Sequence, residues 1–288
     1  MKFFKMHGIG NDYIFVNCLN REPENPNELA KFLCNRHFSI GGDGLILILP
    51  SYSANVQMRI FNSDGSEAEL CGNAIRCLGK YIYDEGLIKN PTVTVETLAG
   101  IKTLQINLSE SIVKSVSVNM GVPILIPDLI PVISNDHMPV IDREIKVDEN
   151  TILYSAVSMG NPHAVVFVYE LDTLPIEKIG SLIEVHSDFP ERTNVEFVQV
   201  LDSGTLKVRV WERGVGETLG CGTGACAVAV ISDIKGLIKN ECIINMRGGI
   251  LKVQVGSTVY LTGNAVYTFS GNINLPKEFK FIKTKKEM

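Results

Sequence analysis

Residues 86–90 read Gly-Leu-Ile-Lys-Asn, and the same five letters return 150 residues later at residues 236–240. The same shift places Cys71-Gly on Cys221-Gly without a gap. One such match can arise by chance, but several in one register point to duplication. The chain is therefore predicted to be two copies of one structural unit. Further matches in this register are Gly10-Asn with Gly160-Asn, Arg59 with Arg209, and Glu67 with Glu217.

Each copy predicts the same order of elements. Apolar or alternating stretches indicate strands, and a polar loop carrying the Cys-Gly pair leads into a helix. The helices are expected over about residues 73–85 and 223–235, and each is followed by a capping glycine, Gly86 or Gly236. The second helix is apolar nearly all round, which predicts a buried central helix. The predicted strands are 13–16, 56–61, 92–96, 103–108 and 113–118, then 164–168, 205–211, 243–246, 251–255 and 258–261.

These elements predict the fold class α+β, with two pseudo-symmetric copies and an active site between them. Each copy is expected to be a curved, mostly antiparallel sheet or barrel wrapped around a central helix. The N-terminal copy is expected at residues 1–121, joined by a C-terminal strand at about 267–288. The C-terminal copy is expected at residues 122–266, after a proline-rich crossing over residues 121–139.

The composition of the chain argues against several classes of function, among them nucleic-acid binding and membrane proteins. The chain has 288 residues, of which 45% are hydrophobic and 20% charged, as expected for a packed globular protein. A net charge of −5 gives no basic surface for nucleic acid or an anionic membrane. No apolar run approaches the roughly 20 residues of a membrane helix, and no signal peptide is visible, so we expect a cytoplasmic protein. The lysine-rich residues 277–286 are predicted to form a solvated tail.

The seven cysteines divide clearly under the repeat. An odd count in a long chain argues against a disulfide framework, and the spacings do not fit structural zinc. Only Cys71 and Cys221 coincide under the shift of 150. The others are predicted to be small buried hydrophobes, namely Cys18, Cys34, Cys77, Cys226 and Cys242.

The matched cysteines suit proton transfer. Each directly precedes a predicted helix, whose free N–H groups and dipole favour negative charge and are expected to lower the thiol pKa. Two such helix ends would also bind an α-carboxylate. An epimerase needs one acid–base group on each face of the α-carbon, which predicts that Cys71 and Cys221 are this pair. The alternative is a shared turn that merely tolerates cysteine.

The copies differ at positions suited to orienting a substrate. Glu212 stands opposite Asn62, and Arg213 stands opposite Ser63. The two charged residues are candidates for binding an ammonium and a carboxylate, with a surface ion pair as the alternative. His163 is a candidate neighbouring base that tunes a thiol.

Several longer motifs surround these positions. They are His7-Gly-Ile-Gly-Asn-Asp-Tyr13, Phe61-Asn-Ser-Asp-Gly-Ser-Glu67 with Cys71-Gly-Asn73, Met159-Gly-Asn-Pro-His163, Glu191-Arg-Thr-Asn-Val195, and Trp211-Glu-Arg-Gly214 leading into Cys221-Gly-Thr-Gly-Ala-Cys226. Together they resemble the motifs of the diaminopimelate epimerase family, over nearly the whole chain to about Gly271. One departure is Gly44, where some members of the family carry Gln.

The resemblance implies an enzyme that interconverts the LL and meso forms of 2,6-diaminoheptanedioate for lysine and peptidoglycan precursor synthesis. It implies no pyridoxal phosphate, no metal, and a cytoplasmic homodimer. Cys71 and Cys221 would be the acid–base pair, with His163 and Glu212 modulating their pKa values. The substrate-binding residues implied are Asn11, Asn62, Gly72, Asn73, Asn161, Asn194, Glu212, Arg213, Gly222 and Thr223.

Other functions remain open at this stage. A proline or hydroxyproline racemase would share the fold and the thiols, but Arg213 and Asn194 are better explained by a larger substrate with a second carboxylate and ammonium. A phosphate- or nucleotide-binding protein is suggested only by the glycines of residues 220–224, with no Gly-Lys-Ser/Thr after them. A redox function of the two thiols would normally use Cys-x-x-Cys, which the chain lacks.

Overall fold

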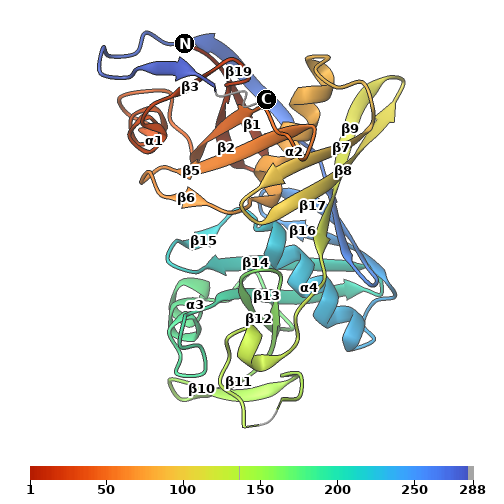
Figure 1. The fold of residues 1–288 in the computed structure, drawn as a ribbon. Coiled ribbons are helices and arrows are strands. Elements are labelled where there is room, and N and C mark those ends of the chain that lie inside the picture. The colour runs from red at the N-terminus through yellow and green to blue at the C-terminus, as the bar shows by residue number, and fades with distance from the viewer. Residues whose placement is uncertain (136, 285–288) are drawn as a thin grey trace. The chain divides into compact units, whose positions relative to one another are not determined.

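The computed structural model describes residues 1–135 and 137–284. The chain forms two compact units. Unit 1 comprises Met1–Val118 together with the chain from Gly263 onward, and unit 2 comprises Asn119–Thr262. Figure 1 labels most of the elements of both units.

Unit 1 holds a long run of strands and two helices. Its elements are β1 (Lys2–Gly8), β2 (Asn11–Asn17), β3 (Arg21–Pro23), α1 (Pro26–Cys34), β4 (Gly44–Leu49), β5 (Val56–Asn62), β6 (Glu67–Ala68), α2 (Gly72–Asp84), β7 (Thr92–Thr97), β8 (Gly100–Ser109), β9 (Ile112–Gly121, which runs past the end of the unit), β19 (Val266–Asn272) and β20 (Phe281–Lys283).

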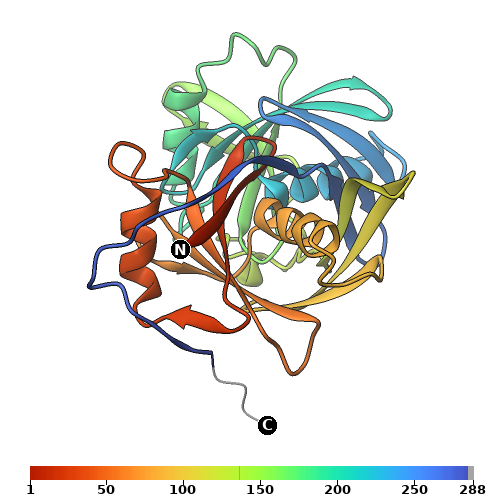
Figure 2. The ribbon, with the colours of Figure 1, turned by 90° about the horizontal axis from the view of Figure 1, so that it is seen from above.

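Strand pairing in unit 1 is mostly antiparallel. The order is β19-β1-β2-β4-β5-β7-β8-β9, in which β2–β4 and β5–β7 are parallel. The two parallel pairs arise because a helix, α1 or α2, connects their strands, as parallel pairing requires a crossover. Helix α2 contacts β1, β2 and β8, and Figure 2 shows it beside the strands of its unit.

Unit 2 repeats this plan. Its elements are the short 3-10 helix η1 (Pro127–Leu129), β10 (Arg143–Val147), β11 (Asn150–Ser158), β12 (Pro162–Phe167), α3 (Ile176–Glu184), β13 (Asn194–Asp202), β14 (Thr205–Glu212), β15 (Gly216–Thr218), α4 (Gly222–Ile234), β16 (Glu241–Met246), β17 (Gly249–Val255) and β18 (Val259–Gly263). Strands β12–β13 and β14–β16 are parallel, as their counterparts are in unit 1.

The predicted duplication is confirmed at the level of single contacts. The Arg59 guanidinium donates to both carboxylate oxygens of Glu67, at 2.6 and 2.9 Å. The Arg209 guanidinium donates to both carboxylate oxygens of Glu217, at 2.8 and 3.0 Å. Each pair links two neighbouring antiparallel strands at the same place in its unit. The fold class predicted from the sequence, curved mostly antiparallel sheets with a central helix in each copy, is confirmed.

The central helices begin and end as the sequence predicts, within one residue. Cys71 and Cys221 are extended N-caps, so each thiol stands at a helix N-terminus. Gly86 and Gly236 follow the C-caps with φ of +68° and +69°, a conformation that glycine adopts without strain. In both, the glycine N–H and the next N–H bond carbonyls of the last turn, which stops the helix.

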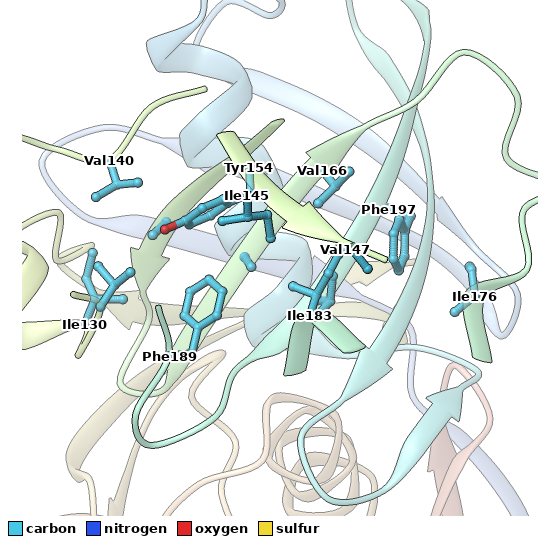
Figure 3. Close-up of a cluster of buried hydrophobic side chains, with 14 of the residues drawn as sticks. Ile130, Val140, Ile145, Val147, Tyr154, Val166, Ile176, Ile183, Phe189 and Phe197 are labelled. Carbon is cyan, nitrogen blue, oxygen red and sulfur yellow. The ribbon is translucent and has the colours of Figure 1, made fainter. Parts of the chain in front are cut away.

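Each unit has its own apolar core. In unit 1, α1 packs Leu29 and Leu33 against β4 and β5. In unit 2, α3 contributes Ile176 and Ile183 to a cluster with Phe197 and other buried side chains (Figure 3). Helix α4 is buried over nearly its whole circumference, as its apolar sequence predicts.

Residues 277–284 of the predicted solvated tail are not detached, because they pair with unit 1. Strand β20 pairs antiparallel with β3. The Thr284 hydroxyl donates to the Cys18 carbonyl at 2.8 Å and is buried. The lysines of this segment are exposed, as expected, but main-chain pairing and apolar side chains such as Phe279 hold the segment on unit 1. Lys285 and Lys286 lie outside the described residues.

Candidate active site

The N-terminal thiol lies among hydrogen-bond donors. The Tyr13 hydroxyl donates to Cys71 Sγ at 3.2 Å. The Cys71 thiol donates in turn to Asn11 Oδ1 at 3.4 Å, and the Asn73 amide donates to the same oxygen at 3.3 Å. Arg76, fully buried one turn into α2, donates to the Gly72 carbonyl at 2.8 Å. Asn11, Gly72 and Asn73 are thus gathered around Cys71.

A charged cluster fixes the Asn11 side chain. Asp43 accepts from the Asn11 amide at 2.7 Å and from the Asp12 backbone N–H at 3.0 Å. Arg36 bridges Asp12 and Asp43, at 2.6 and 2.8 Å. Burial alone would raise the pKa of Asp12, but the cations of Arg36 and Lys5 lower it to about 2, so this carboxylate is charged. The amide oxygen of Asn11 is consequently held toward the thiol.

The C-terminal thiol lies among carboxylates instead. Cys221 Sγ accepts from the Gly224 backbone N–H at 3.4 Å and lies 3.3 Å from the Thr223 hydroxyl. Glu212 also hydrogen-bonds Cys221, and it accepts from the Thr218 hydroxyl at 2.5 Å. Burial raises the pKa of Glu212. Glu212 and Thr223 therefore both contact Cys221.

His163 is held in a buried polar network. Its Nδ1 lies 2.7 Å from Glu196 Oε1, and its Nε2 lies 2.9 Å from Asn161 Oδ1. Both His163 and Glu196 are completely buried. The negative charge of Glu196 raises the pKa of Cys221, so this network influences the C-terminal thiol electrostatically.

Asn194 braces the Arg213 turn. Its amide donates to the Pro162 carbonyl at 2.9 Å, and its Oδ1 accepts from the Arg213 backbone N–H at 2.9 Å. The Arg213 guanidinium is exposed and donates to the Glu191 carbonyl at 3.1 Å. Asn194 therefore fixes the main chain at Arg213 and leaves the guanidinium exposed.

The structure places the Asn62 side chain apart from the Cys71 network and shifts the pKa values of both thiols upward. Asn62 is exposed, and its side-chain amide donates to the nearby Ser66 hydroxyl at 2.9 Å rather than to a member of the Cys71 network. The expected lowering of both thiol pKa values is wrong. Burial raises the pKa of Cys71, and burial together with the charges of Glu212 and Glu196 raises the pKa of Cys221 well above its usual value. The helix N–H groups do lower the thiol pKa values, but the cost of desolvating a thiolate outweighs this effect.

The other cysteines behave as predicted. All five unmatched thiols are at most 3% exposed, and burial raises the pKa of Cys18, Cys34, Cys77 and Cys242 to about 12. Cys71 is half-buried, and every other cysteine among the described residues is buried. These five thiols are therefore structural.

Sequence reasoning missed Tyr13, Asp43 and Glu196. Glu196 does carry a signal, because it interrupts the apolar strand Val195-Glu-Phe-Val198, and a carboxylate inside such a strand requires a polar partner. Tyr13 carries none, since aromatic residues are common in buried strands.

The sequence profile of the diaminopimelate epimerase family matches residues 3–126 and 155–268, which is most of the chain and includes both cysteine loops. The chain belongs to the diaminopimelate epimerase family. The family resemblance inferred from the motifs is thereby confirmed. A diaminopimelate epimerase from Methanococcus maripaludis is 52% identical over 96% of this chain and 100% of its own length. Another from Acetivibrio thermocellus is 51% identical over 96% and 99%.

Solved structures share the fold beyond the diaminopimelate epimerase family. A phenazine biosynthesis protein of the PhzF family from Bacillus anthracis superimposes with a TM-score of 0.71 at 18% identity, covering 96% of this chain and 99% of its own. A hydroxyproline epimerase from Agrobacterium vitis gives 0.67 at 16% identity, covering 95% and 90%. Within residues 1–135 and 137–284, no helix is both long and apolar enough to cross a membrane.

Proposed function

We propose that the chain is a diaminopimelate epimerase that interconverts the LL and meso forms of 2,6-diaminoheptanedioate, with Cys71 and Cys221 as its acid–base pair. The observation that carries this proposal is the pairing of about 50% identity to enzymes of that name with two thiols at equivalent helix N-termini. Similarity to the hydroxyproline epimerase extends only to the fold.

In the proposed reaction, one cysteine thiolate removes the α-proton from one face of the substrate. The electron pair left on the α-carbon delocalises into the α-carboxylate. The other cysteine thiol donates its proton to the opposite face, so the configuration inverts and the two sulfurs exchange protonation states. Each sulfur serves as base in one direction and acid in the other, which suits two groups of the same kind.

The N-termini of α2 and α4 supply the groups that stabilise the anion. Backbone N–H groups at Gly72, Asn73, Gly222 and Thr223 are in the first helical turns, where they lack intrahelical partners. They bind the reacting carboxylate and stabilise the charge that develops there. Asn11, Asn62, Asn161, Asn194, Glu212 and Arg213 bind the remaining polar groups in this proposal.

The difference between the rival substrates gives a direct test. Incubated in heavy water, the protein should exchange the α-proton of diaminopimelate with inversion, and leave proline unlabelled. The assay is read by mass spectrometry and chiral chromatography, with a chelator present and no pyridoxal phosphate added, because the proposed chemistry uses neither metal nor cofactor. Labelling of proline at a rate comparable to diaminopimelate would assign the chain to the racemases of this fold.

The proposal extends to the cellular setting that the resemblance implies. The chain would act in the cytoplasm, in the synthesis of lysine and peptidoglycan precursors, on a small amino-acid substrate, with no nucleic acid and no membrane as partner. We also propose a homodimer, which light scattering coupled to gel filtration measures directly.

A further inference from the structure

Tyr13 is a buried tyrosine whose hydroxyl points at a reactive sulfur. It lies in β2, is 6% exposed, and donates to Cys71 Sγ at 3.2 Å. Burial raises the pKa of this phenol well above its usual value near 10, which favours the neutral O–H. A neutral phenol in this position can only donate to a Cys71 thiolate.

Gly44 provides the space that the tyrosine ring occupies. It lies beside Tyr13 in the parallel pairing of β2 with β4. A Cβ added at Gly44 would stand 2.9 Å from Tyr13 Cε1 and 2.6 Å from the Phe61 carbonyl oxygen. Real Cβ atoms do not approach so closely, so a larger residue at position 44 would force the ring, and the Phe61 carbonyl beside it, to shift. A side chain at position 44 would thus collide with the ring of Tyr13.

The repeat gives Tyr13 a counterpart. Under the shift of 150 residues Tyr13 falls on His163, and Asn11 falls on Asn161. His163 contacts Asn161, and Tyr13 hydrogen-bonds a sulfur that also bonds Asn11. Each copy therefore places an ionisable or hydroxyl-bearing ring at the same strand position, next to the same asparagine.

We propose that Tyr13, seated by Gly44, is a positioning residue that stabilises the thiolate of Cys71 by a hydrogen bond, as the N-terminal counterpart of His163. This inference rests on the proposed function only in assigning chemistry to Cys71; the hydrogen bond itself acts on the sulfur with or without substrate. It makes position 13 a determinant of which thiol ionises first.

Other groups near the sulfur set the background for a pH test. Arg76 in α2 lowers the pKa of Cys71 through its charge, and the N–H groups of Asn73 and Ala74 act in the same direction. Asp43, which precedes β4, raises the pKa of Tyr13 through its charge. The thiol of Cys77 in α2 interacts electrostatically with Cys71. All of these remain unchanged when only the tyrosine hydroxyl is removed.

The test is the pH dependence of iodoacetamide labelling at Cys71, followed by mass spectrometry of its peptide in the full-length protein. Tyr13→Phe should raise the labelling midpoint by about one pH unit, the size expected for loss of one hydrogen bond to a charged group. Tyr81→Phe is the matched control. It removes a buried hydroxyl bonded to Asn17 in the same unit, and should leave the midpoint unchanged.

A second variant should shift the labelling midpoint of Cys71 in the opposite direction. Incorporating 3-fluorotyrosine at position 13 keeps the ring shape but makes the phenol a stronger donor, so the Cys71 midpoint should fall. Gly44→Gln should resemble Tyr13→Phe, because it displaces the ring. The inference is overturned if the Cys71 labelling midpoint is the same in Tyr13→Phe, in the fluorinated protein and in the Tyr81→Phe control.

An active Cys71→Ala variant would instead overturn the proposed function, and it would not contradict the hydrogen bond between Tyr13 and Cys71.

Discussion

The two cysteine loops share one backbone plan but have opposite electrostatic surroundings. Cys71 and Cys221 are both helix N-caps at equivalent positions. Around Cys71 lie a phenol donor and the cation of Arg76, whereas around Cys221 lie the carboxylates of Glu212 and Glu196. Duplication provides two thiols, and divergence of their neighbours acts on their pKa values in opposite directions. The charge of Arg76 lowers the pKa of Cys71, whereas the charges of Glu212 and Glu196 raise that of Cys221.

Among the variants that test this comparison, removal of either thiol is expected to lower the rate of epimerisation most. Cys71→Ala and Cys221→Ala should each lower epimerisation by about a thousandfold or more, the upper part of the range for losing an acid–base group. Turnover by chiral chromatography measures this. Each variant should still exchange the α-proton of one stereoisomer in heavy water, a different one for each variant, because the remaining thiol contacts one face.

The matched controls for the thiols come from the same helices. Cys77→Ala and Cys226→Ala remove fully buried thiols that the repeat does not pair, so they should lower the melting temperature and preserve turnover. A Cys71→Ala or Cys221→Ala variant with wild-type turnover, or two variants that exchange the same stereoisomer, would contradict the two-base assignment.

The next largest effect is expected at Arg213, which stands opposite Ser63 under the repeat. Arg213→Met should lower kcat/KM for diaminopimelate about a hundredfold, because it removes a charge-assisted contact to a carboxylate that does not react. Ser63→Ala, the equivalent change in the other copy, should have little effect. Steady-state kinetics of both variants decides the matter. Equal losses in the two would mean that this difference between the copies does not orient the substrate.

The smallest effect sharpens the electrostatic comparison. Glu212→Gln removes a negative charge that raises the pKa of Cys221, so the pKa of that thiol should fall. Because a thiol reacts as its thiolate, labelling of Cys221 by iodoacetamide at a fixed pH below the midpoint should speed up about tenfold, and that of Cys71 should not change. In the unaltered protein, Cys71 should label at lower pH than Cys221. The reverse order would show that the carboxylates do not govern Cys221.

Much of the fold was predictable because duplication leaves a register in the sequence. The central helices α2 and α4, the strands flanking them and the glycine caps were all predicted from patterns confined to a few residues. Helices α1 and α3 were not predicted, although they occupy Pro26–Cys34 and Ile176–Glu184, the same positions under the shift. Each is only nine residues long, and its stability comes from packing on a sheet more than from its own sequence.

The sequence by itself determined the repeat, the family and the two cysteines that coincide under the repeat, because these depend only on the order and spacing of residues. Only the tertiary structure decided what surrounds each sulfur. Tyr13 and Cys71 are 58 residues apart, and His163 and Glu196 are 33 apart, so no local pattern joins them. The direction of the thiol pKa shifts was likewise set by burial, which arises only when distant segments pack and remove water from the sulfur.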